Sequence, residues 1–461
     1  MAQQTGISTK SKMRVLLINP SSRGTFRLIS MLLPPLGILY VAAAVRKRGY
    51  RVKVVDRSVD HVPINFAAFD VVGIHSDTTF FNRAMALARQ ARSAGVKVVM
   101  GGPHPCFVAE EILETGIVDA IVRGEGEKTF CDLLDAWADG SDPAAIPGLI
   151  CPSPHGITDT GDPDRIEDLD DLPFPARDLI DLSGYSQTRL GYRSLTSMHT
   201  SRGCPYGCNF CSSTRFDGAR WRARSSESVL AELEHVVCDL GFRAVSFMDD
   251  NFTGSPERIY EICDGILRKG LDVHWWCFCR VDTIVRHPEM IKHMAEAGFR
   301  NVFIGVESPS RTLLKQFHKG TDPDQAVNAV KILRQNGIEI LASYILGAPE
   351  EIRSDLRATI RFARELDSDT AQFTLLTPYP GTALFENLKG IISETNWDRF
   401  DAIHSVYRHP RIPRMEMQLW LLWAYISFYL RHGRSISGFF RFLSNRSYGA
   451  RVVSNVMDSR E

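Results

Sequence analysis

The sequence predicts an α/β protein built from two consecutive series of alternating strands and helices. Short apolar runs alternate with stretches of helical periodicity over residues 13–148, and the same alternation returns over residues 194–388. A segment rich in Pro, Asp and Gly separates the two series at residues 149–193, which is typical of a linker. The chain of 461 residues is long enough for two such domains and a small helical C-terminal region at residues 397–461.

The first series predicts a doubly wound parallel sheet, because its strands are apolar throughout and need helices on both faces. We expect strands at 14–18, 51–55, 71–75, 97–100 and 120–122, and helices at 36–47, 82–93, 108–114 and 128–138. Ligands of such sheets bind at the carboxyl ends of the strands. Turns with small or polar residues follow four of these ends, at 19–24, 75–79, 101–105 and 123–127. They indicate a ligand, with simple tight turns as the alternative, and the dinucleotide motif G-x-G-x-x-G is missing.

The second series predicts a partial (β/α)6 TIM-type barrel. Six candidate strands lie at 195–200, 244–248, 273–278, 301–306, 338–345 and 371–376, each followed by a helical stretch or a loop. In barrels of this type the chemistry takes place at the C-terminal ends of the strands. Candidate functional residues are therefore expected at those ends.

Composition excludes several classes of protein. An apolar content of 44% and a charged content of 23% are those of an ordinary globular protein. Because 54 basic residues balance 54 acidic ones, binding to nucleic acid through bulk charge is disfavoured. The residues before Met13 are polar, so we expect no export signal and a cytoplasmic protein. Ten cysteines in that compartment suggest thiols, metal ligands or a cluster rather than disulfides.

Three cysteines, Cys204, Cys208 and Cys211, follow the first strand of the second series in a C-x3-C-x2-C pattern. Three thiolates on one loop suit a [4Fe–4S] cluster in which one iron lacks a protein ligand and can chelate a small molecule. A closed zinc site is one alternative, but it needs four ligands, and no fourth Cys or His lies at a usual spacing. Chance clustering of buried cysteines is the other alternative.

Around this motif the chain resembles the radical S-adenosylmethionine superfamily, over about residues 194–388. The resemblance implies that the three cysteines bind the cluster, whose open iron holds S-adenosylmethionine for cleavage to a 5′-deoxyadenosyl radical. It also implies an electron donor such as flavodoxin or ferredoxin. Phe210 matches the family position near the adenine. Asp250 and Asn251 stand where the family has Gly-Gly-Glu, and they are candidates for the cofactor's amino group.

The third strand of the barrel has a marked alternation. Trp276, Phe278 and Arg280 share one face, while Cys277 and Cys279 share the other. If Arg280 points into the barrel, it can hold a carboxylate in a charge-assisted pair. The two cysteines are then expected to be buried against the helices.

Two later strand ends carry further candidates. Glu307 closes the fourth strand, and the family often uses a carboxylate there for the ribose hydroxyls of the cofactor; an ordinary ion pair is the alternative. Tyr379 follows the sixth strand and is a candidate for a substrate pocket or a radical relay, with core packing as the alternative. The remaining cysteines are expected to be small buried hydrophobes: Cys106, Cys131, Cys151, Cys238 and Cys263.

With the second domain identified, the first resembles the cobalamin-binding domain of the enzymes that join the two. The matching residues on its strand-end turns are Ser76, Thr78, Gly101, Gly102, His104, Gly124, Glu125 and Gly126. Small residues on this edge would let a flat corrin ring lie over the sheet. The D-x-H-x-x-G motif that supplies a cobalt-ligating histidine elsewhere is absent, so we expect a cobalt without a histidine ligand. His104 is then expected to be a hydrogen-bonding loop residue.

The resemblance gives three hypotheses for function. The first is a cobalamin-dependent radical methyltransferase that acts on an unactivated carbon of a hydrophobic or natural-product-like small molecule. The second is a radical oxidative cyclase or oxidoreductase like the anaerobic magnesium-protoporphyrin monomethyl ester cyclase. The third is a non-catalytic corrinoid carrier or sensor, which the intact cysteine triad argues against.

The C-terminal region has a distinct character. Residues 419–430 are apolar nearly all round but are shorter than the ~20 residues of a spanning helix. Nine Arg, no Lys and three acidic residues follow from Val406 onward, with aromatic residues at Phe439, Phe440 and Phe442. A helix of this kind is expected to pack on the barrel. Peripheral contact with the inner face of an anionic membrane, or with a greasy substrate, is the alternative.

Overall fold

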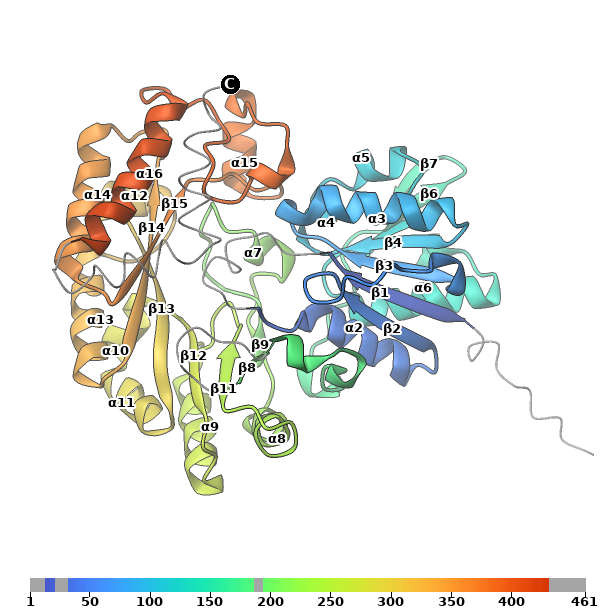
Figure 1. Cartoon of the computed structure of the whole chain (residues 1–461), viewed down its shortest axis with the longest axis horizontal. Coiled ribbons are helices and arrows are strands. Elements are labelled where there is room, and N and C mark those ends of the chain that lie inside the picture. The colour runs from blue at the N-terminus through green and yellow to red at the C-terminus, as the bar shows by residue number, and fades with distance from the viewer. Residues whose placement is uncertain (1–12, 21–31, 186–193, 431–461) are drawn as a thin grey trace, which may run out of the picture. The chain divides into compact units, whose positions relative to one another are not determined.

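The computed structural model describes residues 13–20, 32–185 and 194–430. Within them the chain forms two compact units, one with residues 13–20 and 34–185 and the other with residues 194–430 (Figure 1). Each unit is an α/β structure around its own parallel sheet. The two predicted classes of fold are therefore confirmed.

The first sheet has the strand order β2-β1-β3-β4-β5-β6-β7. The first five strands are parallel, and β6 and β7 add an antiparallel hairpin at one edge. The strands are β1 (Arg14–Asn19), β2 (Arg51–Asp56), β3 (Val71–His75), β4 (Lys97–Gly101), β5 (Ala120–Val122), β6 (Leu149–Ser153) and β7 (Gly156–Asp159). The five parallel strands lie where the apolar runs predict them.

Helices cover both faces of this sheet. In β1, Val15 and Leu17 pack in a core with α2 and α6, whereas Leu16 and Ile18 pack in a second core with α3 and α5. Burial on both faces explains why the strand is apolar at four consecutive positions, Val15 to Ile18, rather than at every second one. The helices are α2 (Leu36–Lys47), α3 (Phe81–Ser93), α4 (Pro103–Phe107), α5 (Ala109–Glu114) and α6 (Gly126–Asp139).

The predicted linker at 149–193 differs from the structure. Its first part is the β6–β7 hairpin, with Leu149 and Ile150 buried, and the rest packs on the first unit through residue 185. The Tyr185 hydroxyl donates to the Asp56 carboxylate at 2.6 Å, and the Ala176 N–H donates to the Leu39 carbonyl at 3.1 Å. The high proline and aspartate content of this segment suggested a linker, because composition does not show which residues between the turns are buried. Residues 186–193 lie outside the described residues.

The second sheet has six parallel strands in the order β15-β14-β13-β12-β11-β8, which is the order of the sequence. The strands are β8 (Leu195–Met198), β11 (Ala244–Phe247), β12 (His274–Cys279), β13 (Phe299–Glu307), β14 (Glu339–Leu346) and β15 (Thr370–Leu375). β8 and β15 are the two ends of the sheet, so the structure is an open, partial barrel. A short hairpin, β9 (Ser201–Arg202) with β10 (Arg222–Ala223), follows the first strand.

Helices α7 to α14 lie between these strands in the sequence, and α15 and α16 follow the last strand. They are α7 (Ser213–Phe216), α8 (Ser226–Glu234), α9 (Pro256–Lys269), α10 (Val281–Arg286), α11 (Pro288–Glu296), α12 (Arg311–Gln316), α13 (Pro323–Gln335), α14 (Arg353–Leu366), α15 (Ala383–Leu388) and α16 (Arg414–Tyr429). Several begin at a side-chain cap, as at Ser255, where the hydroxyl accepts the Arg258 N–H. No helix in the described ranges is long and apolar enough to cross a membrane.

Helix α16 covers the end strand β15 beside α14 (Figure 1). The Tyr425 hydroxyl accepts the Phe373 N–H at 2.9 Å and donates to the Phe373 carbonyl at 2.8 Å. Because an end strand has unpaired backbone groups, these bonds replace the neighbour that β15 lacks. The expected packing on the barrel is therefore observed for α16. The Phe439, Phe440 and Phe442 positions of the membrane alternative lie outside the described residues.

Candidate functional site

The three motif cysteines lie on one loop that follows β9. Cys204, Cys208 and Cys211 are partly exposed, in contrast to the buried cysteines elsewhere in the described residues. The buried set is Cys106, Cys131, Cys151, Cys263, Cys277 and Cys279, as the sequence predicts. Cys238 was expected to be buried too, but it is exposed on the π-helical turn that extends α8.

Backbone contacts fix the first half of this loop. Gly203 has a φ of +83°, and a Cβ there would lie 2.9 Å from the Gly218 carbonyl oxygen. The Cys204 N–H donates to that same carbonyl at 3.2 Å, and the Thr214 hydroxyl donates to the Tyr206 carbonyl at 3.0 Å. These contacts attach the first half of the loop to the segment around Thr214 and Gly218.

The thiols of this loop are a donor set suited to a [4Fe–4S] cluster, whose cysteines bind different irons at separate corners. No group of three Cys, His, Asp or Glu side chains placed to hold a single metal ion is found among the described residues. Burial raises the pKa of the Cys204 and Cys208 thiols, and the nearby Lys319 and Arg280 cations oppose this at Cys208. The donor set fits the cluster.

Phe210 packs against Phe317, with their ring centroids 5.3 Å apart, and it borders an apolar cluster together with Tyr379. Tyr379 is partly exposed, and its carbonyl accepts the Thr382 hydroxyl at 2.7 Å. Both side chains lie in the second unit on loops beside the cysteine motif, since the Leu384 N–H donates to the Asn209 carbonyl at 3.1 Å. Tyr379 thus has the apolar neighbours that core packing, the alternative to a substrate pocket or radical relay, would require.

The three polar residues that follow β11 have different surroundings. Asp249 is buried and accepts the Thr200 N–H at 2.6 Å and the Ser201 hydroxyl at 2.9 Å, so it fixes the strand that leads into the cysteine loop. Asp250 is exposed. Asn251 is buried, and its carbonyl accepts the Trp221 indole N–H at 3.0 Å.

The alternation of β12 is confirmed, but Arg280 has partners that the sequence did not indicate. Cys277 and Cys279 are buried, while Trp276, Phe278 and Arg280 remain partly exposed on the other face. The Arg280 guanidinium donates to the Asp282 carboxylate at 2.9 Å and to the Lys319 carbonyl at 2.8 Å. It also lies 3.6 Å from the Tyr206 ring centroid, so it contacts the cysteine loop directly.

Glu307 forms the ion pair that was the alternative to cofactor binding. Lys319 Nζ lies 2.6 Å from Glu307 Oε1, and both side chains are buried. Gly305 makes room for the pair, since a Cβ at that position would lie 2.5 Å from Lys319 Nζ. Sequence reasoning missed Lys319, because nothing in the sequence links it to a residue on β13.

The loop after β14 holds a further carboxyl group that the sequence did not single out. Glu351 is buried and accepts the Gly347 and Ala348 N–H groups at 2.7 and 2.8 Å. Burial raises its pKa to about 7. The Tyr407 hydroxyl donates to the Gly347 carbonyl, so the loop is held from two sides.

In the first unit, the carboxyl edge brings the turns of β3 and β4 into close contact. Gly102 has a φ of +102°, and a Cβ there would lie 2.7 Å from the Ser76 carbonyl oxygen and 2.8 Å from His75 Nδ1. The Ser76 N–H donates to the Gly101 carbonyl at 2.9 Å. Only a residue without a side chain fits at Gly102, which lets the two turns approach closely.

His104 is buried in this edge rather than exposed on it. Its Nδ1 lies 3.2 Å from the Thr78 hydroxyl, and its ring packs on Phe81 with the centroids 4.4 Å apart. Burial lowers its pKa to about 3, so the imidazole is neutral at physiological pH. The expected hydrogen bond is present, but His104 lies in the short helix α4 rather than in a loop.

The turn after β5, at the same carboxyl edge, contains Gly124, Glu125 and Gly126. Glu125 precedes α6, and its carboxylate accepts the Ile166 N–H at 3.3 Å. A Cβ at Gly126 would lie 3.3 Å from a methyl group of Val41 on α2, so this turn is also closely packed.

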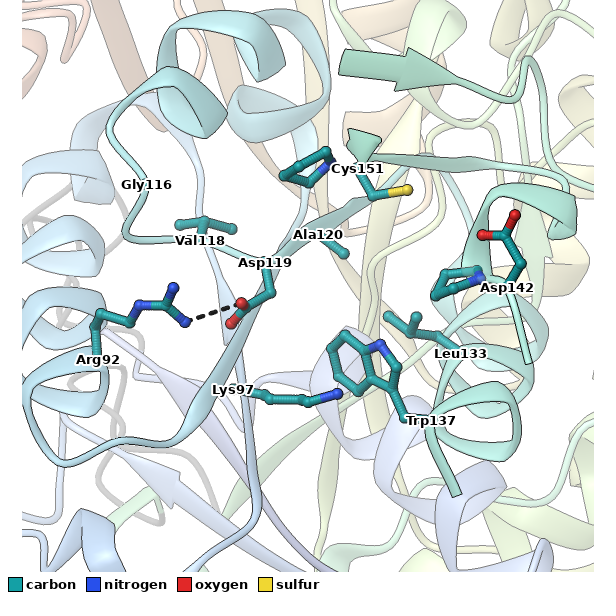
Figure 2. Close-up of a pocket in the computed structure, with 12 residues that line it drawn as sticks. Arg92, Lys97, Gly116, Val118, Asp119, Ala120, Leu133, Trp137, Asp142 and Cys151 are labelled. Carbon is teal, nitrogen blue, oxygen red and sulfur yellow. Dashed lines mark hydrogen bonds and ion pairs between the residues drawn. The ribbon is translucent and has the colours of Figure 1, made fainter. Parts of the chain in front are cut away.

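A cavity of about 370 Å³ lies on the opposite, amino edge of the first sheet, where β4 and β5 begin (Figure 2). Arg92 pairs with Asp119 at 2.9 Å, and Lys97 lies 4.2 Å from the Trp137 ring centroid. These cations have partners within the protein, and the cavity is remote from the turns that carry the predicted cobalamin residues.

Comparison with known proteins gives the same two domains. The profile of the Radical SAM superfamily matches residues 198–363, and that of the B12 binding domain matches residues 26–134. The chain is 36% identical to an uncharacterized methyltransferase, PH0819, of Pyrococcus horikoshii, over 91% of this chain and 93% of the relative.

Two further relatives have named reactions. The anaerobic magnesium-protoporphyrin IX monomethyl ester cyclase of Cereibacter sphaeroides is 26% identical over 91% of this chain and 71% of its own. The bacteriochlorophyllide d C-12(1)-methyltransferase of Chlorobaculum tepidum is 27% identical over 87% of this chain and 84% of its own. Among solved structures, the radical S-adenosylmethionine methyltransferase TsrM of Kitasatospora setae superposes with a TM-score of 0.68 at 22% identity, covering 81% of this chain and 77% of that one, which shows the shared fold.

Proposed function

The chain belongs to the cobalamin-binding radical S-adenosylmethionine methyltransferase family, and from this premise we propose that it methylates an unactivated carbon of a hydrophobic, ring-containing small molecule. The enzyme uses a [4Fe–4S] cluster, S-adenosylmethionine and cobalamin. When bound, these groups supply the radical that activates the substrate carbon and the methyl group that it receives. The residues of the chain bind, orient and shield them.

An aromatic surface inside the barrel carries the proposal of a hydrophobic substrate. Trp276 and Phe278 on β12 and Phe303 on β13 form a chain of edge-to-face contacts, with ring centroids 5.2 and 5.1 Å apart. All three are partly exposed, while the residues that alternate with them face the helices and are buried. Such a surface suits a flat apolar molecule. The indole N–H of Trp276 is buried without a partner among the described residues, so it can donate to a substrate oxygen.

For the site residues, we propose that Cys204, Cys208 and Cys211 hold the cluster and that Phe210 packs beside the adenine. Asp250 and Asn251 are proposed for the amino group of S-adenosylmethionine, with Arg280 for its carboxylate. Glu307 retains one carboxylate oxygen beyond its ion pair for the ribose. Tyr379 is proposed to border the substrate. In the first unit, the proposed cobalamin residues are Ser76, Thr78, Gly101, Gly102, His104, Gly124, Glu125 and Gly126.

An oxidative cyclase reaction is the second candidate, because a relative that matches 91% of this chain carries that name. Anaerobic reconstitution followed by mass analysis of products separates the two. Methyl transfer requires S-adenosylhomocysteine and 5′-deoxyadenosine in equal amounts. Production of 5′-deoxyadenosine alone would overturn the methyltransferase proposal in favour of the cyclase.

Cobalamin binding has its own test. Reconstituted full-length protein should retain a corrin absorbance after gel filtration, and a protein without it would contradict the residues proposed for the first unit.

We also propose that a flavodoxin or ferredoxin supplies the electron. A cluster that dithionite reduces but that neither of these proteins reduces would contradict this proposal.

Membrane contact is proposed from the free face of α16. Leu419, Trp423 and Leu430 are each about half exposed on this helix, at 47%, 52% and 50%. The sequence beyond it adds six Arg against two acidic residues, which suits the inner face of an anionic membrane. The protein should sediment with phosphatidylglycerol vesicles at low salt, and Trp423→Ser should reduce this. Sedimentation no greater than with neutral vesicles would overturn the proposal.

A further inference from the structure

The turn that ends α12 holds the cysteine loop at several points. The backbone N–H of Asn209, between Cys208 and Cys211, donates to the Phe317 carbonyl at 3.1 Å. The Asn209 side-chain amide donates to the Gln316 carbonyl at 2.8 Å. With the ring contact between Phe210 and Phe317, these bonds attach the second half of the loop to Gln316 and Phe317.

Local structure explains the shape of this turn. The Lys319 N–H donates to the Leu314 carbonyl and the His318 N–H to the Lys315 carbonyl, at 3.0 and 3.1 Å, which is the Schellman pattern of a helix end. His318 takes the left-handed conformation that this pattern needs, with a φ of +53°. The chain then directs Lys319 inward, where only 9% of it is exposed.

The buried pair of Lys319 with Glu307 completes the connection. Glu307 has a φ of +63°, an uncommon conformation for a residue with a side chain, at an irregularity in the pairing of β13 with β14. The Lys319 carbonyl accepts from Arg280, which stacks on Tyr206 of the cysteine loop. A pair that only stabilised the barrel end would not need these links to the loop.

We propose that Lys319 and Glu307 are positioning residues that set the reduction potential of the cluster held by Cys204, Cys208 and Cys211. The inference rests on the proposed role of these cysteines. Reduction adds an electron to the cluster, so a nearby cation favours the reduced form and a nearby anion disfavours it. Removal of Lys319 should therefore lower the potential, and neutralisation of Glu307 should raise it.

The test compares reconstituted wild-type protein with Lys319→Met, Glu307→Gln and the double variant, without S-adenosylmethionine. The midpoint potential is measured by titration with dithionite, followed by electron paramagnetic resonance, and iron content is measured in parallel. Lys269→Met is the matched control, because Lys269 pairs with Glu234 at 2.7 Å on the surface.

The expected result is full iron in every variant, a lower potential in Lys319→Met, a higher one in Glu307→Gln and an intermediate one in the double variant. Shifts in the same direction, or none beyond that of the control, would overturn the inference. If Lys319→Met does not fold, the sign of the shift in the isosteric Glu307→Gln decides. A wild-type protein that binds no cluster would instead contradict the proposed role of the cysteines.

Discussion

The carboxyl edges of the two sheets are built differently. In the first unit, Gly102 lies against the backbone of the β3 turn and His104 is a buried neutral imidazole. In the second unit, the same edge carries partly exposed thiols and the charged side chains of Arg280, Glu307 and Lys319. A flat corrin ring needs a low surface and close backbone approach, whereas an iron–sulfur cluster needs ligands and a controlled charge. The same topological position therefore carries different residue chemistry in the two units.

The largest effect is expected at the thiols of the second unit. Cys208→Ala should lose most of the iron of a protein that otherwise binds about four irons per chain, because the cluster then has two protein ligands. Iron analysis after anaerobic reconstitution measures this, and the exposed Cys238→Ala is the control with full iron. A Cys208→Ala protein with normal iron and cleavage of S-adenosylmethionine would refute the assignment.

On the first edge, Gly102→Ala should destabilise the protein by about 4 kcal/mol, from a strained positive φ and a Cβ clash together. Gly95→Ala is the matched control, since Gly95 has a φ of +75° but no atom within 4 Å of the added Cβ. The control should cost about 1 kcal/mol from backbone strain alone. Chemical denaturation of the full chain measures both, and equal losses would show that close packing at Gly102 is unimportant.

Burial shifts the pKa of titratable groups in both units, and Glu351 gives a pH test in the second. Its pKa is about 7 in the folded protein against 4.5 for the ordinary carboxyl group. The folded state therefore holds a proton that the unfolded state releases between these values, so stability falls as pH rises through this range. Glu351→Gln should remove up to about 3 kcal/mol of this loss at pH 8.

The measurement for Glu351 is the unfolding free energy at about pH 5.5 and at about pH 8. These values lie about one unit above the pKa of the unfolded and of the folded state, respectively. The difference between wild type and Glu351→Gln should be larger at pH 8. A stabilisation independent of pH would mean that the carboxyl group is ionised at both values, contrary to its burial.

The smallest effect concerns the cover of the end strand. Tyr425→Phe should cost about 1–3 kcal/mol, because it leaves the Phe373 N–H and carbonyl buried without their partner. Tyr429→Phe should cost less, because its hydroxyl lies 3.4 and 3.3 Å from the Ala371 backbone groups. Thermal unfolding of the two variants gives the comparison, and equal shifts would show that the helix is held by its apolar face alone.

The sequence by itself determined the elements whose signal is periodic or local. Strands buried on both faces are apolar without interruption, so β1 to β5 and the six barrel strands could be predicted from the run of residues. The alternation of β12 likewise predicted which face buries Cys277 and Cys279. The C-x3-C-x2-C spacing could also be read from the sequence, because all three cysteines lie within eight residues of one loop.

Only the tertiary structure decided the contacts between segments distant in sequence. The β6–β7 hairpin was mistaken for a linker, since its burial depends on pairing with β5 rather than on composition. Lys319 reaches Glu307 because the end of α12 directs it inward and Gly305 leaves space for the pair. No local sequence pattern predicts either condition. The contacts of Arg280 with Asp282 and Tyr206 were likewise visible only in the folded structure. Period and spacing are properties of a chain segment, whereas the partner of a buried charge is a property of the packed fold.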